Sequence, residues 1–336
     1  PEVGPLEGHV GFQWSYQDND NQPGTNTVLF IPNYQNSRFG FYVNEQLEHG
    51  DNLFDFGIRY DYLNMNITGR EQDNTLFSNT LTFQNFTATI GWERELSKTW
   101  TLRTNLGTAW RPPNVFELYV FGKHQATIEY GIFRHQRNED GTIDTNVILD
   151  ENDKPIYSEV GYKWVTTASY RKNRTELEAT GYVNYIKDYI YATPAGITLT
   201  VRGAFPFFVY DQTDALLAGV DGTLRIYHNP RLTSHAKASF VYARDVSNSD
   251  YFVEIPPLKL NYGIEYQFSP QRDLRLKADF TYLFRQFMYP EVVPVEEFLE
   301  PPQPVPDGNF DFMDAPDGTL LVNVGLFRSG EKFSYS

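Results

Sequence analysis

Cysteine is absent from the 336-residue sequence. Its absence excludes a disulfide framework, a thiolate metal site and a cysteine nucleophile. Long apolar runs are absent too, and none approaches the roughly 18 consecutive residues that a transmembrane helix requires. The chain is therefore either soluble or crosses a membrane as β-strands.

Positive charge is scarce in this chain. Lysine and arginine number 28 against 43 aspartates and glutamates, which gives a formal net charge of -15. Nucleic-acid phosphates would be repelled unless the chain had a strong basic patch, and the sequence shows none. We therefore expect no nucleic-acid partner.

Signatures of catalysis and of a resident cofactor are also lacking. There is no Gly-x-Ser-x-Gly elbow, and no serine, histidine and acid grouping stands out. The acidic, proline-rich stretch 291–317 could bind cations, but such a composition is more often a solvated loop, and it lacks the spacing of a calcium loop. We expect no enzyme, no catalytic residue, no metal site and no cofactor.

Aromatic residues, in contrast, are abundant. They make up 16% of the chain and include 23 tyrosines and 26 phenylalanines. The wall of a membrane β-barrel needs such rings at both membrane interfaces, whereas an average soluble domain uses fewer of them. The composition favours a barrel wall.

Apolar and polar residues alternate with period 2, most clearly in 273–285, and a helix would mix the two sets. The same alternation recurs in 54–62, 102–110 and 258–268. In 273–285 one face holds Leu274, Leu276, Ala278, Phe280, Tyr282 and Phe284, and the other holds Asp273, Arg275, Lys277, Asp279 and Thr281.

The connections between these segments distinguish a barrel from a soluble β-sandwich, because only a membrane barrel keeps tight turns on one rim and long loops on the other. The predicted tight links and long connections strictly alternate along the chain. The tight links are 48–51, 96–99, 171–174, 228–230, 269–273 and 329–332, and the long connections are 18–35, 64–78, 111–156, 192–205, 245–256 and 288–318.

The charged face fixes the orientation of the wall. A lysine or arginine that faces lipid at mid-bilayer costs roughly 2–4 kcal/mol, so Arg275 and Lys277 must point into the lumen. The aromatic face then contacts outer-membrane lipid. A lumen with this much charge must hold water or a polar plug, because an isolated charge in a dry core is very costly.

These patterns predict an all-β fold, an antiparallel transmembrane β-barrel of about thirteen strands over residues 1–336. We expect the barrel to be incomplete at both ends. Residues 1–8 lack the features of a signal peptide, and Ser336 lies inside an apparent strand.

Several motifs resemble those of TonB-dependent outer-membrane receptors, in the same order and at similar spacing. Residues 110–119, WRPPNVFELY, resemble the segment that opens a long extracellular loop of the family, with Pro112 in place of the usual alanine. Three further segments resemble the continuation of this loop and the strand that leaves it: 122–124, GKH, 128–131, IEYG, and 158–162, SEVGY. Two others, 182–190, YVNYIKDYI, and 218–222, AGVDG, resemble later wall strands.

The resemblance, to the iron-complex branch of the family, implies uptake across the bacterial outer membrane of a large, scarce ligand, a ferric siderophore or another metal complex. It implies a barrel of about 22 strands, a plug domain that this chain does not contain, and a TonB partner that acts through that missing region. The loop's usual Asn and Pro-Glu pattern is replaced by an Asp- and Asn-rich stretch, 138–153, so ligand specificity does not transfer with the resemblance.

The loop 111–156 is the candidate ligand site, since irregular connections of this length are usually functional or disordered. Arginine, tyrosine and histidine suit anionic iron complexes by charge and hydrogen bonding, although each could equally be a solvated loop residue. An alternative haem receptor would use His124 or His135 as an axial ligand. The candidate ligand-binding residues are Arg111, His124, Tyr130, Arg134, His135 and Arg137.

Other functions remain open at this point. A cobalamin receptor of the same family fits the wall equally well. A passive, substrate-selective porin would have a loop folded inward to form a charged constriction and no plug domain. A soluble β-rich binding domain would remain in solution without detergent.

Overall fold

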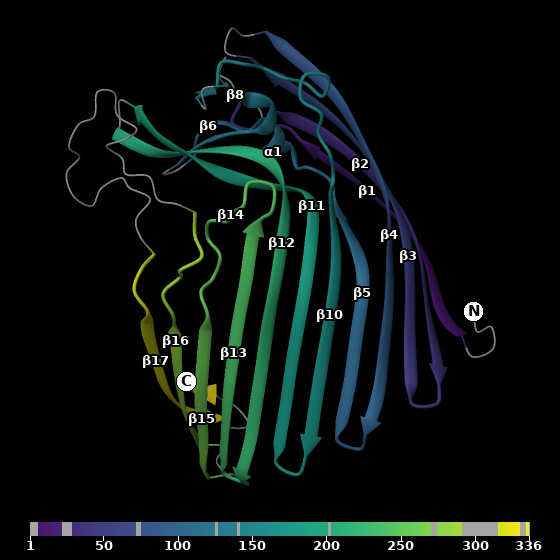
Figure 1. Ribbon diagram of the computed structural model, residues 1–336, viewed down its shortest axis with the longest axis vertical. Coiled ribbons are helices and arrows are strands. Elements are labelled where there is room, and N and C mark those ends of the chain that lie inside the picture. The colour runs from purple at the N-terminus through teal and green to yellow at the C-terminus, as the bar shows by residue number, and fades with distance from the viewer. Residues whose placement is uncertain are drawn as a thin grey trace.

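The computed structural model of the chain describes residues 6–21, 29–71, 75–124, 127–139, 142–200, 203–269, 274–290, 315–329 and 334–335. Within these ranges β-strands predominate (Figure 1). No helix in the described ranges is long and apolar enough to cross a membrane. Most of the acidic stretch 291–317 lies outside the described residues.

Thirteen strands of the described chain form one continuous antiparallel path, in agreement with the predicted number. Each strand of this path pairs with its neighbour along it, β5 with β10 and β13 with β15 included, and the sheet is strongly curved (Figure 1). The strands are β1 (Leu6–Asn19), β2 (Asn33–His49), β3 (Asn52–Arg70), β4 (Leu76–Ser97), β5 (Trp100–Arg111), β10 (Glu159–Lys172), β11 (Thr175–Thr200), β12 (Gly203–Asn229), β13 (Leu232–Asp245), β15 (Lys259–Ser269), β16 (Leu274–Leu283), β17 (Thr319–Ser329) and β18 (Ser334–Tyr335).

The predicted tight links 48–51, 96–99, 171–174 and 228–230 join strands at one rim, at the bottom of Figure 1. The predicted links 269–273 and 329–332 lie mostly outside the described residues. Two of these turns use left-handed backbone: Gly50 has φ 60° and Asn173 has φ 53°. Glycine adopts this conformation without steric cost, and asparagine tolerates it better than most residues. The longer connections leave the opposite rim.

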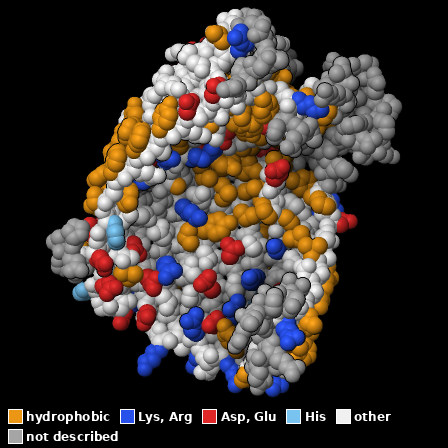
Figure 2. Space-filling view, turned by 180° about the vertical axis from the view of Figure 1, so that it is seen from behind, with side chains coloured by type: hydrophobic (Ala, Val, Ile, Leu, Met, Phe, Trp, Pro, Cys, Tyr) orange, Lys and Arg blue, Asp and Glu red, His pale blue; other side chains and the backbone are white. Residues whose placement is uncertain are grey.

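The two faces of the sheet differ as predicted. Phe280, Tyr282 and Leu326 are exposed on one face, whereas Arg275 and Lys277 both form ion pairs with Glu265 on the other. Acidic and basic side chains lie inside the hollow of the concave face (Figure 2). The apolar face is therefore the outer, lipid-facing one, and the charged face lines the lumen.

The predicted long connection 64–78 is wrong. Strands β3 and β4 continue to Arg70 and from Leu76, in register throughout. The reason is a change in the apolar face: outward Tyr60 and Tyr62 are followed by inward Leu63, Met65 and Ile67, which are 6%, 2% and 0% exposed. Apolar and polar residues still alternate beyond Tyr62, but the apolar side chains now point inward. A prediction based on outward-facing apolar residues therefore ends the strand too early.

The predicted connection 192–205 is also wrong. Strands β11 and β12 are 26 and 27 residues long and continue through the predicted connection, so that only residues 201–202 separate them. Pro194 and Gly196, which are unusual inside a strand, lie at a register shift within the ladder. Strand β13 ends at Asp245, opposite Ala215. The hairpin formed by the ends of β11 and β12 therefore projects beyond the neighbouring wall strands β10 and β13.

Candidate ligand-binding site

Residues 112–158, which we call the roof, connect β5 to β10 at the rim of long connections (Figure 1). They form a small folded unit in place of the irregular loop expected from the sequence. Its elements are α1 (Val115–Tyr119), β6 (Phe121–His124), β7 (Thr127–Tyr130), η1 (Ile132–Arg134), β8 (Gln136–Arg137) and β9 (Ile143–Asp144).

Helix α1 begins with a capping box. The Asn114 side chain accepts a hydrogen bond from the backbone N–H of Phe116, and the Glu117 side chain accepts one from the backbone N–H of Asn114. These contacts satisfy backbone donors that a short helix leaves unpaired, which is worth about 1 kcal/mol for a good cap. The segment 110–119, which resembles the opening of the receptor loop, thus contains the start of helix α1.

An apolar core fixes the roof to the inner surface of the wall. Val115, Leu118 and Tyr119 of α1 pack with residues of η1 against the inward side chains of β3 and β4. Full burial of one such side chain contributes about 1.5–3 kcal/mol. The buried members of this core are Leu63, Met65, Ile67, Leu81, Phe83, Val115, Leu118, Tyr119, Ile132, Phe133 and Ile190.

Arg134 makes the first ionic anchor of the roof. Its Nη1 lies 2.6 Å from Oε2 of Glu71 at the end of β3, and both side chains are buried. The guanidinium carbon lies 4.9 Å from the ring centre of Phe77 and 5.9 Å from that of Tyr119. Because burial raises the pKa of Tyr119 to about 12, the hydroxyl stays neutral beside this cation.

Asp211 makes the second anchor, on the projecting part of β12. Its Oδ1 lies 3.2 Å from Nε2 of His135 and 3.1 Å from Nζ of Lys154, and its Oδ2 lies 3.7 Å from Nη2 of Arg137. Burial alone would raise the pKa of Asp211, but the contact with His135 and the charge of Lys154 hold it at about 2. The carboxylate is therefore charged at neutral pH and holds three basic residues of the roof.

Arg111 makes the third anchor, where the roof leaves β5. Its Nη1 lies 2.7 Å from Glu117 in α1, and its Nε lies 2.6 Å from Glu159 at the start of β10. Glu159 also accepts a hydrogen bond of 2.7 Å from the backbone N–H of Ile190. Arg111 thus joins the beginning of the roof, its helix and the wall beyond it.

Strand β7 attaches the roof to the sheet. It pairs in parallel with β12, with Ile128 opposite Phe207 and Tyr130 opposite Val209. This pairing uses the edge of β12 that β13 leaves free. The ring of Tyr130 contacts Phe121 and Phe207 edge-on, at 5.2 and 5.5 Å between centroids.

The structure brings most of the predicted site residues together in the roof, but as anchors. Arg134 and His135 are 3% and 1% exposed, and both ring nitrogens of His135 are engaged, by Asp211 and by the carbonyl of Gly131. An axial haem bond from His135 would require one of these contacts to break. The side chain of His124 lies outside the described residues. Arg137 is the most exposed of the three arginines predicted to bind the ligand.

Sequence reasoning missed the acidic partners of these residues. Glu71 and Asp211 lie far from the roof in sequence, whereas Glu159 directly follows it, in the segment 158–162. The excess of carboxylates was visible, but no local spacing linked any one of them to an arginine. Their pairing depends on the curvature of the sheet and on the change of apolar face in β3.

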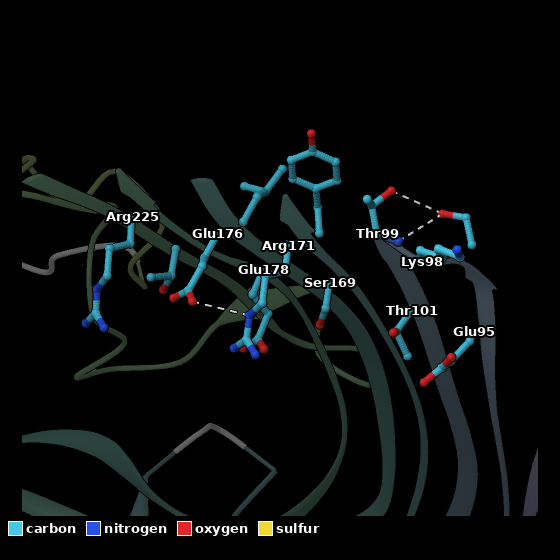
Figure 3. A pocket seen from close by; sticks show the side chains of 13 residues that line it. Glu95, Lys98, Thr99, Thr101, Ser169, Arg171, Glu176, Glu178 and Arg225 are labelled. Atoms are coloured by element: carbon cyan, nitrogen blue, oxygen red, sulfur yellow. Dashed lines mark hydrogen bonds and ion pairs between the residues drawn. The ribbon is translucent and has the colours of Figure 1, made fainter. Parts of the chain in front are cut away.

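A charged hollow of ≈ 480 Å³ lies on the lumen face at the opposite, tight-turn rim (Figure 3). Arg171 and Glu176 form an ion pair of 3.2 Å there. Glu176 and Glu178 share the lumen face of β11. In the described residues, no three side chains of His, Asp or Glu lie close enough together to hold a metal ion.

Comparison with known proteins identifies the fold. Residues 3–321 match the family description "TonB dependent receptor-like, beta-barrel". None of the curated proteins compared with the chain matches it.

Three solved structures illustrate the likeness. The copper transporter OprC is 14% identical with a TM-score of 0.69 over 97% of this chain and 47% of its own. A ferric enterobactin receptor from Pseudomonas aeruginosa is 14% identical with a TM-score of 0.63 over 98% and 45%. The FrpB iron transporter from Neisseria meningitidis is 12% identical with a TM-score of 0.61 over 97% and 46%.

The chain thus spans about half the length of the structures it matches. At these identities the likeness shows the fold, and the family match covers most of the sequence. The relatives are receptors and transporters, and none of the three is an enzyme. The chain belongs to the family of TonB-dependent receptor β-barrels of the bacterial outer membrane.

Proposed function

We propose that this chain forms the wall and the mouth of a receptor that imports a metal complex through the outer membrane, with a ferric siderophore as the leading candidate. By the mouth we mean the roof together with the strand ends and connections at the rim that carries it. The observation that carries the proposal is the roof, a preformed unit fixed by Arg111, Arg134 and Asp211 at the rim of long connections. A rigid mouth lowers the ordering cost of ligand binding. The names of the compared structures, which include copper, iron and ferric enterobactin, agree with this ligand class.

The proposal includes a plug domain in the lumen and coupling to TonB. The lumen face supports it, because Lys98, Arg171, Glu178 and Arg225 surround the hollow of Figure 3 and require polar surroundings. A polar plug or water satisfies that need. Transport driven through such a plug would need an energy source.

Uptake of radiolabelled iron complexes by the source bacterium tests the proposal. Deletion of the gene is expected to abolish uptake of at least one ferric complex, and the intact gene on a plasmid is expected to restore it. Removal of TonB should abolish the same uptake, because the plug would stay closed. Uptake that persists without TonB would contradict the proposal and favour a passive porin.

A further inference from the structure

Most cations of the roof, and Arg111 at its start, already contact carboxylates of the protein itself. Arg134 pairs with Glu71 inside the apolar core, and Arg137 and Lys154 both contact Asp211. Arg111 is held between Glu117 and Glu159. An anion that bound Arg134 would have to displace Glu71 and would leave a buried charge without its partner, whereas Arg137 and Lys154 share one carboxylate and are partly exposed.

Lys123 differs from these cations but does not alter the balance. Its ammonium lies 3.5 Å from the ring centre of Phe205, above the aromatic face. It is the one described lysine or arginine of the roof with no ion pair among the described residues. A single flexible lysine provides little of the bidentate recognition that arginine gives to carboxylates and phosphates.

Several carboxylates of the mouth, in contrast, carry no ion pair within the described chain. Asp150, Glu151 and Asp153 are exposed at a turn of the roof. Hydrogen bonds from the backbone N–H groups of Asn152 and Asp153 help hold the pKa of Asp150 below its usual value, so that it remains charged. The roof therefore presents net negative charge to the outside.

The inner side of the mouth is electronegative as well. Tyr210 of β12 lies 5.5 Å from Phe116, edge to face. Burial raises the pKa of Tyr210 first of all, and the charges of Glu129, Glu117 and Glu254 raise it further. These three carboxylates come from β7, α1 and the connection between β13 and β15, so they surround the phenol from separate elements, and only Glu117 has an ion-pair partner, Arg111, among the described residues.

The connection between β16 and β17 adds to the same pattern in sequence. Strand β16 ends at Leu283 on the rim that carries the roof. From 291 to 317 the connection contains glutamates and aspartates but no lysine or arginine. Asp317 of this stretch pairs with Arg285, and residues 291–314 lie outside the described residues.

We propose that this mouth selects neutral or cationic metal complexes and disfavours polyanionic ones. The inference rests on the proposed function and gives its ligand a charge class. Charge of one sign at a binding cleft changes association rates by about 10–10³-fold, and the effect declines as salt screens it. Aromatic faces such as Phe116 and Tyr210 also attract a cation rather than an anion.

Association kinetics of the full-length receptor in nanodiscs test this inference. The probes are two ferric complexes of similar size: a trihydroxamate complex with a free ammonium, and a trianionic tris-catecholate complex. At low salt we expect the cationic complex to associate at least about 10-fold faster. The difference should shrink as ionic strength rises.

A matched pair of variants separates charge from shape. Glu151 is exposed and its side chain forms no hydrogen bond or ion pair among the described residues. Glu151→Lys should speed association of the trianionic complex by roughly 2–10-fold. Glu48→Lys makes the same charge change at the tight-turn rim and should have no effect. Faster or tighter binding of the trianionic complex by the unaltered receptor would overturn the inference while leaving the importer intact. Binding of neither complex, together with no TonB-dependent uptake of any ferric complex, would remove the proposed function and the inference together.

Discussion

Replacement of Arg134 by alanine is expected to release the roof from the wall. The change leaves Glu71 charged and buried without its partner, at 7% exposure, and removes the cation that lies against Phe77 and Tyr119. Breaking a buried ion pair by removal of one partner costs about 3–5 kcal/mol. The roof is a small unit, so we expect this cost to be comparable to the free energy that keeps the roof folded against the wall.

Hydrogen exchange of the full-length receptor measures the effect locally. Backbone amides of 115–137 should lose protection in Arg134→Ala, while amides of the wall strands β10 and β13 should keep theirs. Arg137→Ala is the matched control, since its contact with Asp211 is longer and its side chain is 48% exposed. Equal protection in the two variants would show that the Arg134 anchor does not hold the roof.

Introduction of an arginine at Val220 is expected to impair insertion of the barrel into a membrane. Val220 is 58% exposed and lies on the apolar face of β12, opposite Gly181 and Phe240. An arginine that faces lipid at mid-bilayer costs roughly 2–4 kcal/mol. Folding into liposomes, followed by urea titration, measures this free energy.

The control lies three residues further along the same strand. Thr223 points to the lumen, where it lines the charged hollow with Glu178 and Arg225 (Figure 3). Thr223→Arg should therefore change the folding free energy by less than about 1 kcal/mol. A similar loss for both variants, or a larger loss for Thr223→Arg, would mean that the faces of the sheet are assigned the wrong way round.

Much of the wall could be predicted because its physical signal is local. The alternation in 273–285 fixes both the strand and its orientation, since only one of the two faces tolerates contact with lipid. The tight turns were equally visible from their composition. Each of these features depends on neighbours within about ten residues, which a single sequence displays.

The extended strands could not be predicted in the same way. In β3 the apolar face changes between Tyr62 and Leu63, because the outer environment changes from lipid to water and the inner one from lumen to the roof's core. In β12, residues 207–209 stay in a strand because β7 pairs with their free edge. Both causes lie in the roof, which is distant in sequence.

In the candidate site, too, features that depend on local sequence could be predicted, and features that depend on distant residues could not. The roof was identified by its length and by the segment 110–119, and its arginines were predicted to bind the ligand. Their partners Glu71, Glu159 and Asp211 make them anchors, and this assignment requires the folded arrangement. Ligand contact by the exposed residues, Arg137 among them, stays a prediction.

The direction in which apolar side chains face along the wall explains the fold and supports the proposed function. Apolar side chains that face outward below the level of Tyr62 hold the wall in lipid, and apolar side chains that face inward above it hold the roof. The mouth is thereby built on the wall itself. A rigid mouth of fixed charge can then sort ligands before any movement inside the lumen.

A spin-label scan along β3 tests this central claim most directly. Because these 336 residues lack cysteine, a single cysteine introduced at each of positions 56–67 is the one labelled site in this part of the receptor. In lipid bilayers, labels at 56, 58 and 60 should be accessible to oxygen in the lipid, labels at 57, 59 and 61 should not, and labels at 64 and 66 should be accessible only to a water-soluble relaxation agent. Water accessibility at 56, 58 and 60, or lipid accessibility at 64 and 66, would contradict the account.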